Sequence, residues 1–328
     1  MSNIHASIDV GSNTLRLLIA RPVPNSPNTA TAQAWEIIDY RHLITRLGEG
    51  LHESGRLSDA AMERTLQALQ LFKSVIDHHQ VASEQLRATA TAAVREAKNG
   101  TLFQQQAEKK TGIHLSIIDG EEEAKLSLLG ASSVLHEETS SDMLLFDIGG
   151  GSTEFVRSKN SSAIDAISCK LGVVRLVEAH LHSDPPSTED YLTMKKAAHD
   201  HLEMVAEHWR KISGSAPKSL VGTAGTVTTL AAVQMNLVPY DPEQVNNHQI
   251  SHENFISLRN HLLNLNHEQR QNIPAIEPGR ADLIIAGLAI IEAIMEKWGY
   301  KSLITVDAGL LEGNWLDSYE DKSGDTAK

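Results

Sequence analysis

A short pattern that occurs twice in the chain constrains the fold more than any other feature. Residues 9–14 read Asp-Val-Gly-Ser-Asn-Thr, and residues 147–153 read Asp-Ile-Gly-Gly-Gly-Ser-Thr. Each segment places an aspartate at the end of an apolar, β-favouring run, directly before a turn of small and hydroxyl residues. The aspartates lie 147 − 9 = 138 residues apart, about the length of one domain. This spacing predicts an internal duplication of a strand-turn-strand hairpin.

The apolar pattern around the two hairpins predicts an α/β fold. Runs rich in β-branched residues predict strands, and apolar residues at helical spacing predict helices between and after them. The tail after Asp317 is polar and is expected to fray. The predicted strands cover residues 4–10, 14–20, 35–41, 86–89, 115–118, 142–148, 153–157, 163–168, 220–222 and 303–306. One predicted helix begins after Ser58, and the others cover residues 102–110, 121–135, 188–212, 227–233, 252–265 and 280–298.

Length, composition and charge limit the class of protein. A chain of 328 residues with 41% hydrophobic residues can bury two cores, so two domains are the simplest expectation. The chain lacks a secretory signal and any apolar run of the roughly 20 residues that cross a membrane, which predicts a cytoplasmic location. The single cysteine, Cys169, excludes an intrachain disulfide and is expected in the core. The net charge of −13 argues against binding to nucleic acid or to an anionic membrane.

Three loops could hold an anionic group locally in this acidic chain. Glycine lets backbone N–H groups converge on an anion, and hydroxyl side chains add donors. The third loop, residues 223–226, precedes a predicted helix, and the N-terminus of a helix favours negative charge. Taken singly, each loop is also compatible with an ordinary tight turn. The candidate phosphate-binding residues are Ser12, Asn13, Gly149, Gly150, Gly151, Ser152, Thr153, Thr223, Ala224, Gly225 and Thr226.

Three carboxylates near the hairpin turns could bind a divalent cation. Asp9 and Asp147 end strands at the turns, and Glu154 follows Ser152 by two residues. Oxygen ligands of this kind suit Mg²⁺ (or Mn²⁺), which takes one or two protein carboxylates and completes its shell with water and phosphate. For Asp9, capping of the turn is an equal alternative.

An acidic helix start and one arginine provide candidate catalytic groups. Residues 119–125 place three consecutive glutamates in a first helical turn at the junction of the two halves, where one could activate water. Acidic residues there also complement the helix dipole, and composition does not tell which of them is the base. Arg95 follows a short predicted strand and could clamp a phosphate; a solvated arginine at a helix start is the alternative.

Five motifs in chain order resemble those of the exopolyphosphatase and guanosine pentaphosphate phosphohydrolase family (Ppx/GppA), in its short two-domain form. The resemblance covers nearly the whole chain, with similar segments also at 170–176 and 306–313. Asp119 departs from the family pattern, in which serine is expected. The motifs are residues 9–14, 89–95 (Thr-Ala-Thr-Ala-Ala-Val-Arg), 118–124 (Ile-Asp-Gly-Glu-Glu-Glu-Ala), 146–154 (Phe-Asp-Ile-Gly-Gly-Gly-Ser-Thr-Glu) and 221–226 (Val-Gly-Thr-Ala-Gly-Thr).

The resemblance implies a fold and a domain organisation. The implied fold is the duplicated actin-like (ribonuclease H-like) ATPase fold, an α/β architecture with two lobes around an interlobe cleft. The N-terminal lobe is expected at residues 1–121 and the C-terminal lobe at 122–309, with a C-terminal helix at 310–328 that packs back on the first lobe.

The resemblance also implies an activity and its residues. Glu123 is expected as the water-activating base, with Glu122 as the alternative, while Arg95 and the three loops hold phosphate and Asp147 and Glu154 organise the metal. The expected substrate is inorganic polyphosphate or the stringent-response nucleotide guanosine pentaphosphate (pppGpp), and the expected assembly is a homodimer. An actin-like ATPase or kinase, or a non-catalytic polyphosphate sensor, are the competing interpretations.

Overall fold

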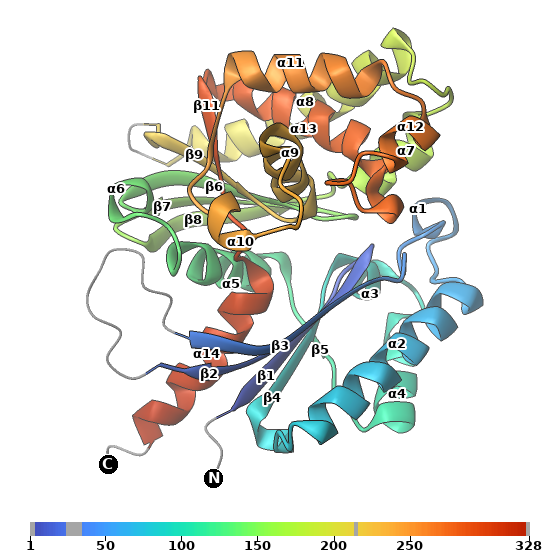
Figure 1. Ribbon diagram of the computed structural model, residues 1–328, viewed down its shortest axis with the longest axis vertical. Coiled ribbons are helices and arrows are strands. Elements are labelled where there is room, and N and C mark those ends of the chain that lie inside the picture. The colour runs from blue at the N-terminus through green and yellow to red at the C-terminus, as the bar shows by residue number, and fades with distance from the viewer. Residues whose placement is uncertain (1–3, 24–34, 213–215, 326–328) are drawn as a thin grey trace. The chain divides into compact units, whose positions relative to one another are not determined.

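The computed structural model describes residues 4–23, 35–212 and 216–325, and the chain divides into two compact units (Figure 1). Unit 1 comprises Met1–Val134 and Ala308–Lys328, and unit 2 comprises Leu135–Asp307. The boundary expected after residue 121 differs from this division because it falls inside helix α5 (Gly120–Ser132). Helix α5 packs against the C-terminal helix α14 (Leu310–Asp325) within unit 1, so both helices belong to that unit.

Unit 1 is built on a five-stranded sheet in the order β3-β2-β1-β4-β5. The first three strands along the chain are antiparallel, and β4 and β5 continue the sheet in parallel. Apolar side chains from β1, β2 and helix α2 form its core. The strands are β1 (His5–Val10), β2 (Thr14–Pro22), β3 (Trp35–Ile44), β4 (Leu86–Ala90) and β5 (Ser116–Ile117). Besides α5 and α14, the unit contains α1 (Leu51–Ser54), α2 (Asp59–His78), α3 (Ala92–Glu96) and α4 (Gly100–Thr111).

Unit 2 is built on a six-stranded sheet in the order β10-β11-β9-β6-β7-β8. Its core includes almost every side chain of α13, because that helix is apolar on all sides and is packed by α7, α8 and α9. The strands are β6 (Asp142–Ile148), β7 (Thr153–Lys159), β8 (Ser162–Cys169), β9 (Ser219–Thr223), β10 (Gln249–Ser251) and β11 (Ser302–Thr305). The helices are α6 (Glu137–Ser140), α7 (Val173–His180), α8 (Thr188–Trp209), α9 (Gly225–Met235), α10 (Pro242–Val245), α11 (His252–Leu263), α12 (His267–Gln271) and α13 (Leu283–Trp298).

The two sheets share one topology, which confirms the predicted duplicated actin-like α/β fold. In each sheet, the first three strands along the chain are antiparallel neighbours. The next strand pairs in parallel with the first strand, on the edge that the hairpin leaves open. Strands β1, β2, β3 and β4 therefore correspond to β6, β7, β8 and β9. The turns also match. Gly11 N donates to Thr14 O at 2.9 Å, and Gly149 N donates to Ser152 O at 2.9 Å. The repeat seen in the sequence is therefore a repeat of structure.

Several local expectations need correction. Helix α14 continues to Asp325, past Asp317 where a frayed tail was expected. Arg280 does not begin a long helix, because residues Pro278–Arg280 form a separate short 3-10 turn and α13 starts at Leu283. The short helices α3 and α7 lie beside the turns and were not predicted, since neither is long enough to show a periodic pattern. Cys169 is buried, as predicted.

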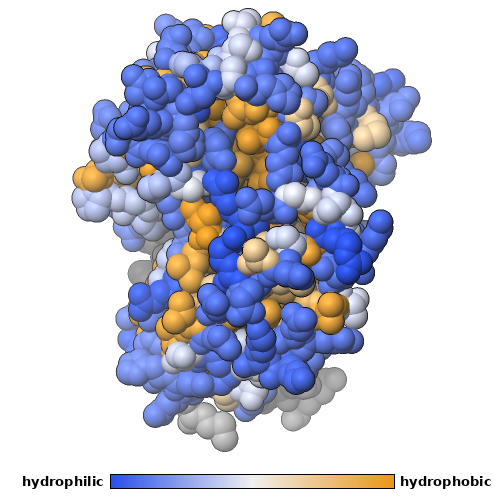
Figure 2. All heavy atoms as spheres, turned by 90° about the vertical axis from the view of Figure 1, so that its right-hand side faces the viewer, coloured by the Kyte–Doolittle hydropathy of each residue, from blue (hydrophilic) through white to orange (hydrophobic). Residues whose placement is uncertain are grey.

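The described helices include none with the length and apolarity needed to cross a membrane. The face of the molecule in Figure 2 is mostly hydrophilic, with hydrophobic residues gathered in separate patches.

Candidate active-site residues of the two units

The first hairpin turn is held by a loop that follows β3. Gly48 N donates to Ser12 O at 2.7 Å, and Arg46 N donates to Asn13 O at 2.9 Å. Ser12 and Asn13 are both buried, and Asn13 Oδ1 has no hydrogen-bond partner. The carbonyls of Ser12 and Asn13 are thus engaged by the loop, while the amides of these two residues donate to no other residue in the part of the chain that the structure describes. An unengaged amide pair is the feature that a phosphate-binding turn needs.

Asp9 forms a buried ion pair with Arg16 on the neighbouring strand. Arg16 Nη2 lies 2.7 Å and Nε 3.1 Å from Asp9 Oδ2, whereas Asp9 Oδ1 is buried without a partner. Burial lowers the pKa of the Arg16 guanidinium, but the charge of Asp9, with Tyr40 and Glu312, outweighs it and raises this pKa above its usual range. The negative charge of Asp9 is therefore already neutralised by a permanent cation.

Glu123 and Arg95 are brought together in unit 1. Arg95 Nη1 donates to Glu123 Oε2 at 3.0 Å and to Ile118 O at 2.8 Å. Both side chains are shielded, with 23% of Arg95 and 9% of Glu123 exposed. The two predicted catalytic residues, 28 positions apart, thus form one ion pair.

The other acidic residues of this segment have different surroundings. Asp119 caps α5, since its side chain accepts hydrogen bonds from Glu121 N and Glu122 N. Aspartate and serine are both good N-caps, so the departure from the family pattern keeps the helix start intact. Glu122 is 48% exposed and lies 3.4 Å from Arg87, away from the Arg95 pair. This geometry favours Glu123 over Glu122 as the base.

In unit 2 the glycine turn is held by the start of α7. Val173 N and Val174 N donate to the carbonyls of Gly149 and Gly150 at 3.1 and 3.0 Å. A Cβ on Gly172 would lie 2.3 Å from Gly150 O, so only glycine permits this close approach. As in unit 1, the turn carbonyls are engaged, and the Gly150 and Gly151 amides donate to no described residue.

The hydroxyl groups of this turn are not free donors, contrary to the expectation from sequence. Ser152 Oγ donates to Glu154 Oε1 at 2.7 Å, and Thr153 Oγ1 donates to Leu171 O. Glu154 also accepts from Ser168 Oγ at 2.7 Å. Because a hydroxyl has one proton to donate, the donors that remain for phosphate at this turn are backbone amides.

Asp147 and Glu154 face each other across the β6–β7 hairpin. Side chains directly opposite in an antiparallel pair lie on one face, and like charges there repel. At the equivalent position of unit 1, Asp9 faces Arg16. Two carboxylates on one face of a hairpin are oxygen ligands of the kind that a divalent cation takes. No group of three or more His, Cys, Asp or Glu side chains converges among the described residues, and Mg²⁺ requires only one or two carboxylates.

The third loop joins β9 to α9 and is covered by an arginine. Ala224 has φ 74, an unusual backbone conformation for a residue with a side chain, and Thr223 and Thr226 are buried. A Cβ on Gly225 would lie 1.2 Å from Arg280 Nη1, so the guanidinium occupies the space beside this glycine. Arg280 Nε also donates to Glu277 at 3.0 Å. A cation is therefore held at the N-terminus of α9.

Sequence reasoning missed two arginines and one loop of this arrangement. Arg280 was expected as the first residue of a helix, and no local signal relates it to Gly225. Arg175 was given no role, yet its Nε donates to Gly151 O at 2.7 Å. The sequence also indicated no role for the loop of residues 45–48. All three depend on contacts between residues distant in sequence.

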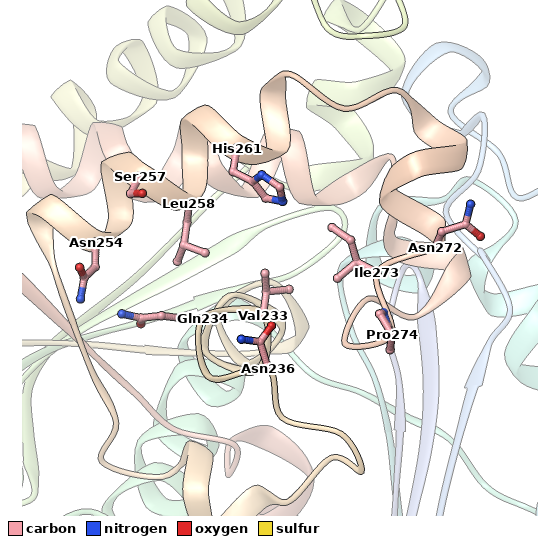
Figure 3. A pocket seen from close by; sticks show the side chains of 10 residues that line it. All are labelled: Val233, Gln234, Asn236, Asn254, Ser257, Leu258, His261, Asn272, Ile273 and Pro274. Carbon is pink, nitrogen blue, oxygen red and sulfur yellow. The ribbon is translucent and has the colours of Figure 1, made fainter.

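Cavities in unit 2 lie apart from these residues. The cavity in Figure 3, of about 600 Å³, is lined by the end of α9, by α11 and by the segment after α12. Its lining contains Gln234, Asn254 and His261 but no lysine, arginine or carboxylate. It lies at the opposite end of α9 from Thr226, roughly 15 Å away along the helix at ~1.5 Å per residue. A polyanion would find no charge compensation there.

The chain is similar to proteins of one family in sequence and in structure. The model of the Ppx/GppA phosphatase family matches residues 28–322. Exopolyphosphatase 2 of Mycobacterium tuberculosis is 30% identical over 317 residues, which make up 94% of this chain and 96% of that protein. A bifunctional 3-dehydroquinate synthase/phosphatase of Fusobacterium nucleatum is 31% identical over 97% of this chain, which spans 47% of that longer protein. The crystal structure of the Aquifex aeolicus member of the Ppx/GppA family has a TM-score of 0.77, 31% identity and 98% coverage of both chains.

Proposed function

Because the chain belongs to the Ppx/GppA phosphatase family, we propose that it is an exopolyphosphatase, which removes the terminal phosphate of inorganic polyphosphate. Family membership makes it a hydrolase of phosphoanhydride bonds. The similarity to a mycobacterial exopolyphosphatase over almost the full length of both proteins favours polyphosphate as substrate.

One observation carries the catalytic assignment: the shielded Glu123 carboxylate lies 3.0 Å from Arg95 at the start of α5. Glu123 is the base that orients and deprotonates the attacking water, and Arg95 binds the phosphoryl group that is transferred. The water oxygen forms a bond to the terminal phosphorus, the bridging P–O bond breaks, and the water proton passes to Glu123. The shortened polyphosphate leaves with the bridging oxygen.

The turns of both units bind phosphate through backbone amides. Ser12 and Asn13 in unit 1 and Gly150 and Gly151 in unit 2 supply these amides, and residues 223–226 supply the N-terminus of α9. Arg280 adds a positive charge beside Gly225. Preorganised donors of this kind stabilise the highly charged transition state of phosphoryl transfer.

Phosphatases of this family depend in general on a divalent metal. Asp147 and Glu154 are the residues that hold Mg²⁺ or Mn²⁺ in this proposal, because their carboxylates lie at directly opposite positions of the β6–β7 hairpin beside the glycine turn. When bound, the metal neutralises phosphate charge. Asp9 is the weaker candidate ligand, since Arg16 already binds one of its oxygens. A homodimer and a cytoplasmic location stay predictions of the sequence.

A pppGpp phosphohydrolase is the alternative within the family, because both substrates end in the same phosphoanhydride. Purified protein given each substrate separately, with phosphate release measured, distinguishes the two. Phosphate release from ATP alone, or transfer to an acceptor, would instead favour an actin-like ATPase or kinase. Tight binding without turnover under any divalent metal would favour a sensor.

The Glu123→Gln variant tests the proposed role of the base. The amide keeps the shape of the side chain but cannot take a proton, so kcat is expected to fall by about 10²- to 10⁴-fold while KM for polyphosphate changes little. Glu122→Gln is the matched control, and its kcat is expected to stay near that of the wild type. Near-wild-type phosphate release by Glu123→Gln would contradict the proposal.

A further inference from the structure

Two glycines bring helices α5 and α14 of unit 1 into direct backbone contact (Figure 1). A Cβ on Gly313 would lie 1.8 Å from Leu126 O, and a Cβ on Gly130 would lie 2.0 Å from Gly309 O. Ordinary contact begins near 3.4 Å, so neither helix tolerates even a methyl group at these positions. The separation of the two helices is therefore fixed by main-chain atoms, which cannot rotate away as side chains do.

Helix α14 is in turn fastened to the sheet. Ser7 Oγ on β1 donates to Leu311 O at 2.8 Å, and Trp315 Nε1 donates to His5 O at 3.1 Å. Asn314 is fully buried, and its Nδ2 donates to Thr89 Oγ1 on β4 at 2.6 Å. These bonds anchor α14 to the two strands that lead to the hairpin turn and to the Arg95 segment.

The face of α5 that meets α14 also carries the proposed base. Glu123 precedes Gly130 by seven residues, and residues seven apart lie on the same side of a helix. Leu126, whose carbonyl meets Gly313, is one turn from Glu123. A displacement of α5 at this contact would therefore move the Glu123 carboxylate relative to Arg95 and β1.

We propose that Gly130 and Gly313 are positioning residues, which set the place of Glu123 by allowing α5 to rest on the backbone of α14. This inference rests on the proposed role of Glu123 as base. The C-terminal helix thereby becomes part of the catalytic apparatus, although it contributes no group that touches substrate.

Alanine at either glycine tests the proposal. The added methyl group forces the helices apart by roughly 1.5 Å, and a misplacement of about 1 Å can reduce the rate by about 10²-fold. Gly313→Ala and Gly130→Ala are expected to lower kcat by about 10- to 100-fold while KM for polyphosphate stays within about twofold. Asn314→Ala removes one tether without adding atoms, so it is expected to lower kcat by several-fold even if an alanine variant does not fold.

Two controls separate positioning from loss of stability. Gly112→Ala changes a glycine of the same unit that has φ +72 and nothing within 4 Å of the added Cβ, so kcat should not change. Leu66→Ala opens a cavity in the core of unit 1 and should lower the melting temperature without lowering kcat below that temperature. A wild-type kcat for both glycine variants, or an equal loss of kcat in Leu66→Ala, would overturn the inference.

A double-mutant cycle separates this inference from the proposed function. If Gly313 acts through Glu123, adding Gly313→Ala to Glu123→Gln lowers the residual kcat by less than about twofold. If Gly313→Ala lowers kcat in the Glu123→Gln background by the same factor as in the wild type, the positioning role is overturned, while the proposed role of Glu123 as base is unaffected. Wild-type turnover by Glu123→Gln alone would instead refute the base, whatever Gly313→Ala does.

Discussion

At the residue scale, the duplicated hairpins differ at one position that decides their chemistry. The residue opposite the strand-end aspartate is Arg16 in unit 1 and Glu154 in unit 2. Asp9 is thus neutralised within the protein, whereas Asp147 faces a second carboxylate. The two copies of the hairpin therefore differ in charge at this position, and the proposed cation site belongs to the second copy.

Asparagine substitutions at the two aspartates test this assignment. Asp147→Asn is expected to raise the Mg²⁺ concentration needed for half-maximal activity by at least about 10-fold, because it removes one charged ligand. Asp9→Asn is expected to leave this concentration within about threefold but to lower the free energy of unfolding by about 2 kcal/mol, since Arg16 loses its buried partner. Metal titrations of activity, combined with urea unfolding, measure both. A larger change in metal requirement for Asp9→Asn would assign the cation to unit 1.

Cys169 shows that proximity to a site does not make a residue part of it. Burial, together with the nearby charge of Glu154, raises the pKa of the thiol to about 12. The thiolate is therefore scarce at neutral pH, and Cys169 is excluded as a nucleophile for phosphoryl transfer.

At the element scale, a short helix holds the glycine turn of unit 2. Helix α7 has only eight residues, but its first amides bind the carbonyls of Gly149 and Gly150. The Gly150 amide donates to no described residue, so it is available to an anion. The stability of α7 comes from tertiary packing, because a helix of this length is marginal by itself.

Gly172→Ala tests the contact between α7 and the turn. The Cβ would lie 2.3 Å from Gly150 O, so α7 must move and the turn must change its shape. KM for polyphosphate is expected to rise about 10-fold, and the free energy of unfolding to fall by about 2 kcal/mol, as in overpacked cores. Gly299→Ala is the control, because it strains a glycine with φ +74 that has no atom within 4 Å of the added Cβ. Gly299→Ala should lower the free energy of unfolding by about 1 kcal/mol without a change in KM for polyphosphate. Equal KM values for the two variants would contradict a role of α7 in phosphate binding.

At the scale of the whole molecule, the proposed function requires an acidic protein to bind a polyanion. The net charge of −13 opposes approach of polyphosphate, so binding depends on a few converging amides, arginines and a cation. The described cores of the two units, in contrast, are clusters of apolar side chains. Metal should therefore govern activity and not folding.

Removal of divalent metal with EDTA tests this separation. Phosphate release is expected to fall by at least about 10²-fold and to return on addition of Mg²⁺ or Mn²⁺. The melting temperature of the protein without substrate is expected to change by less than about 2 °C, because the cation is not a structural ligand. Calorimetry and a phosphate-release assay on the same sample measure both. Full turnover in EDTA would refute a metal requirement, and a large drop in melting temperature would indicate a structural site.

The features that could be predicted from the sequence are those that arise from local interactions. Turn chemistry and strand periodicity predicted both hairpins, and their repetition predicted the duplicated fold. The N-terminal acidic turn of α5 predicted a base among three glutamates. The hairpins and the duplicated fold are confirmed, because turn conformation and the alternation of apolar residues depend on neighbours along the chain, whereas the base stays a prediction.

Only the tertiary structure decided which side chains meet. It placed Arg95 beside Glu123 and not Glu122, and it brought Arg280 against Gly225. It also assigned α5 and α14 to one unit, through glycines whose role no local pattern indicates. The reason is physical: contacts between distant segments follow from how whole elements pack, and packing depends on the combined shape of both surfaces.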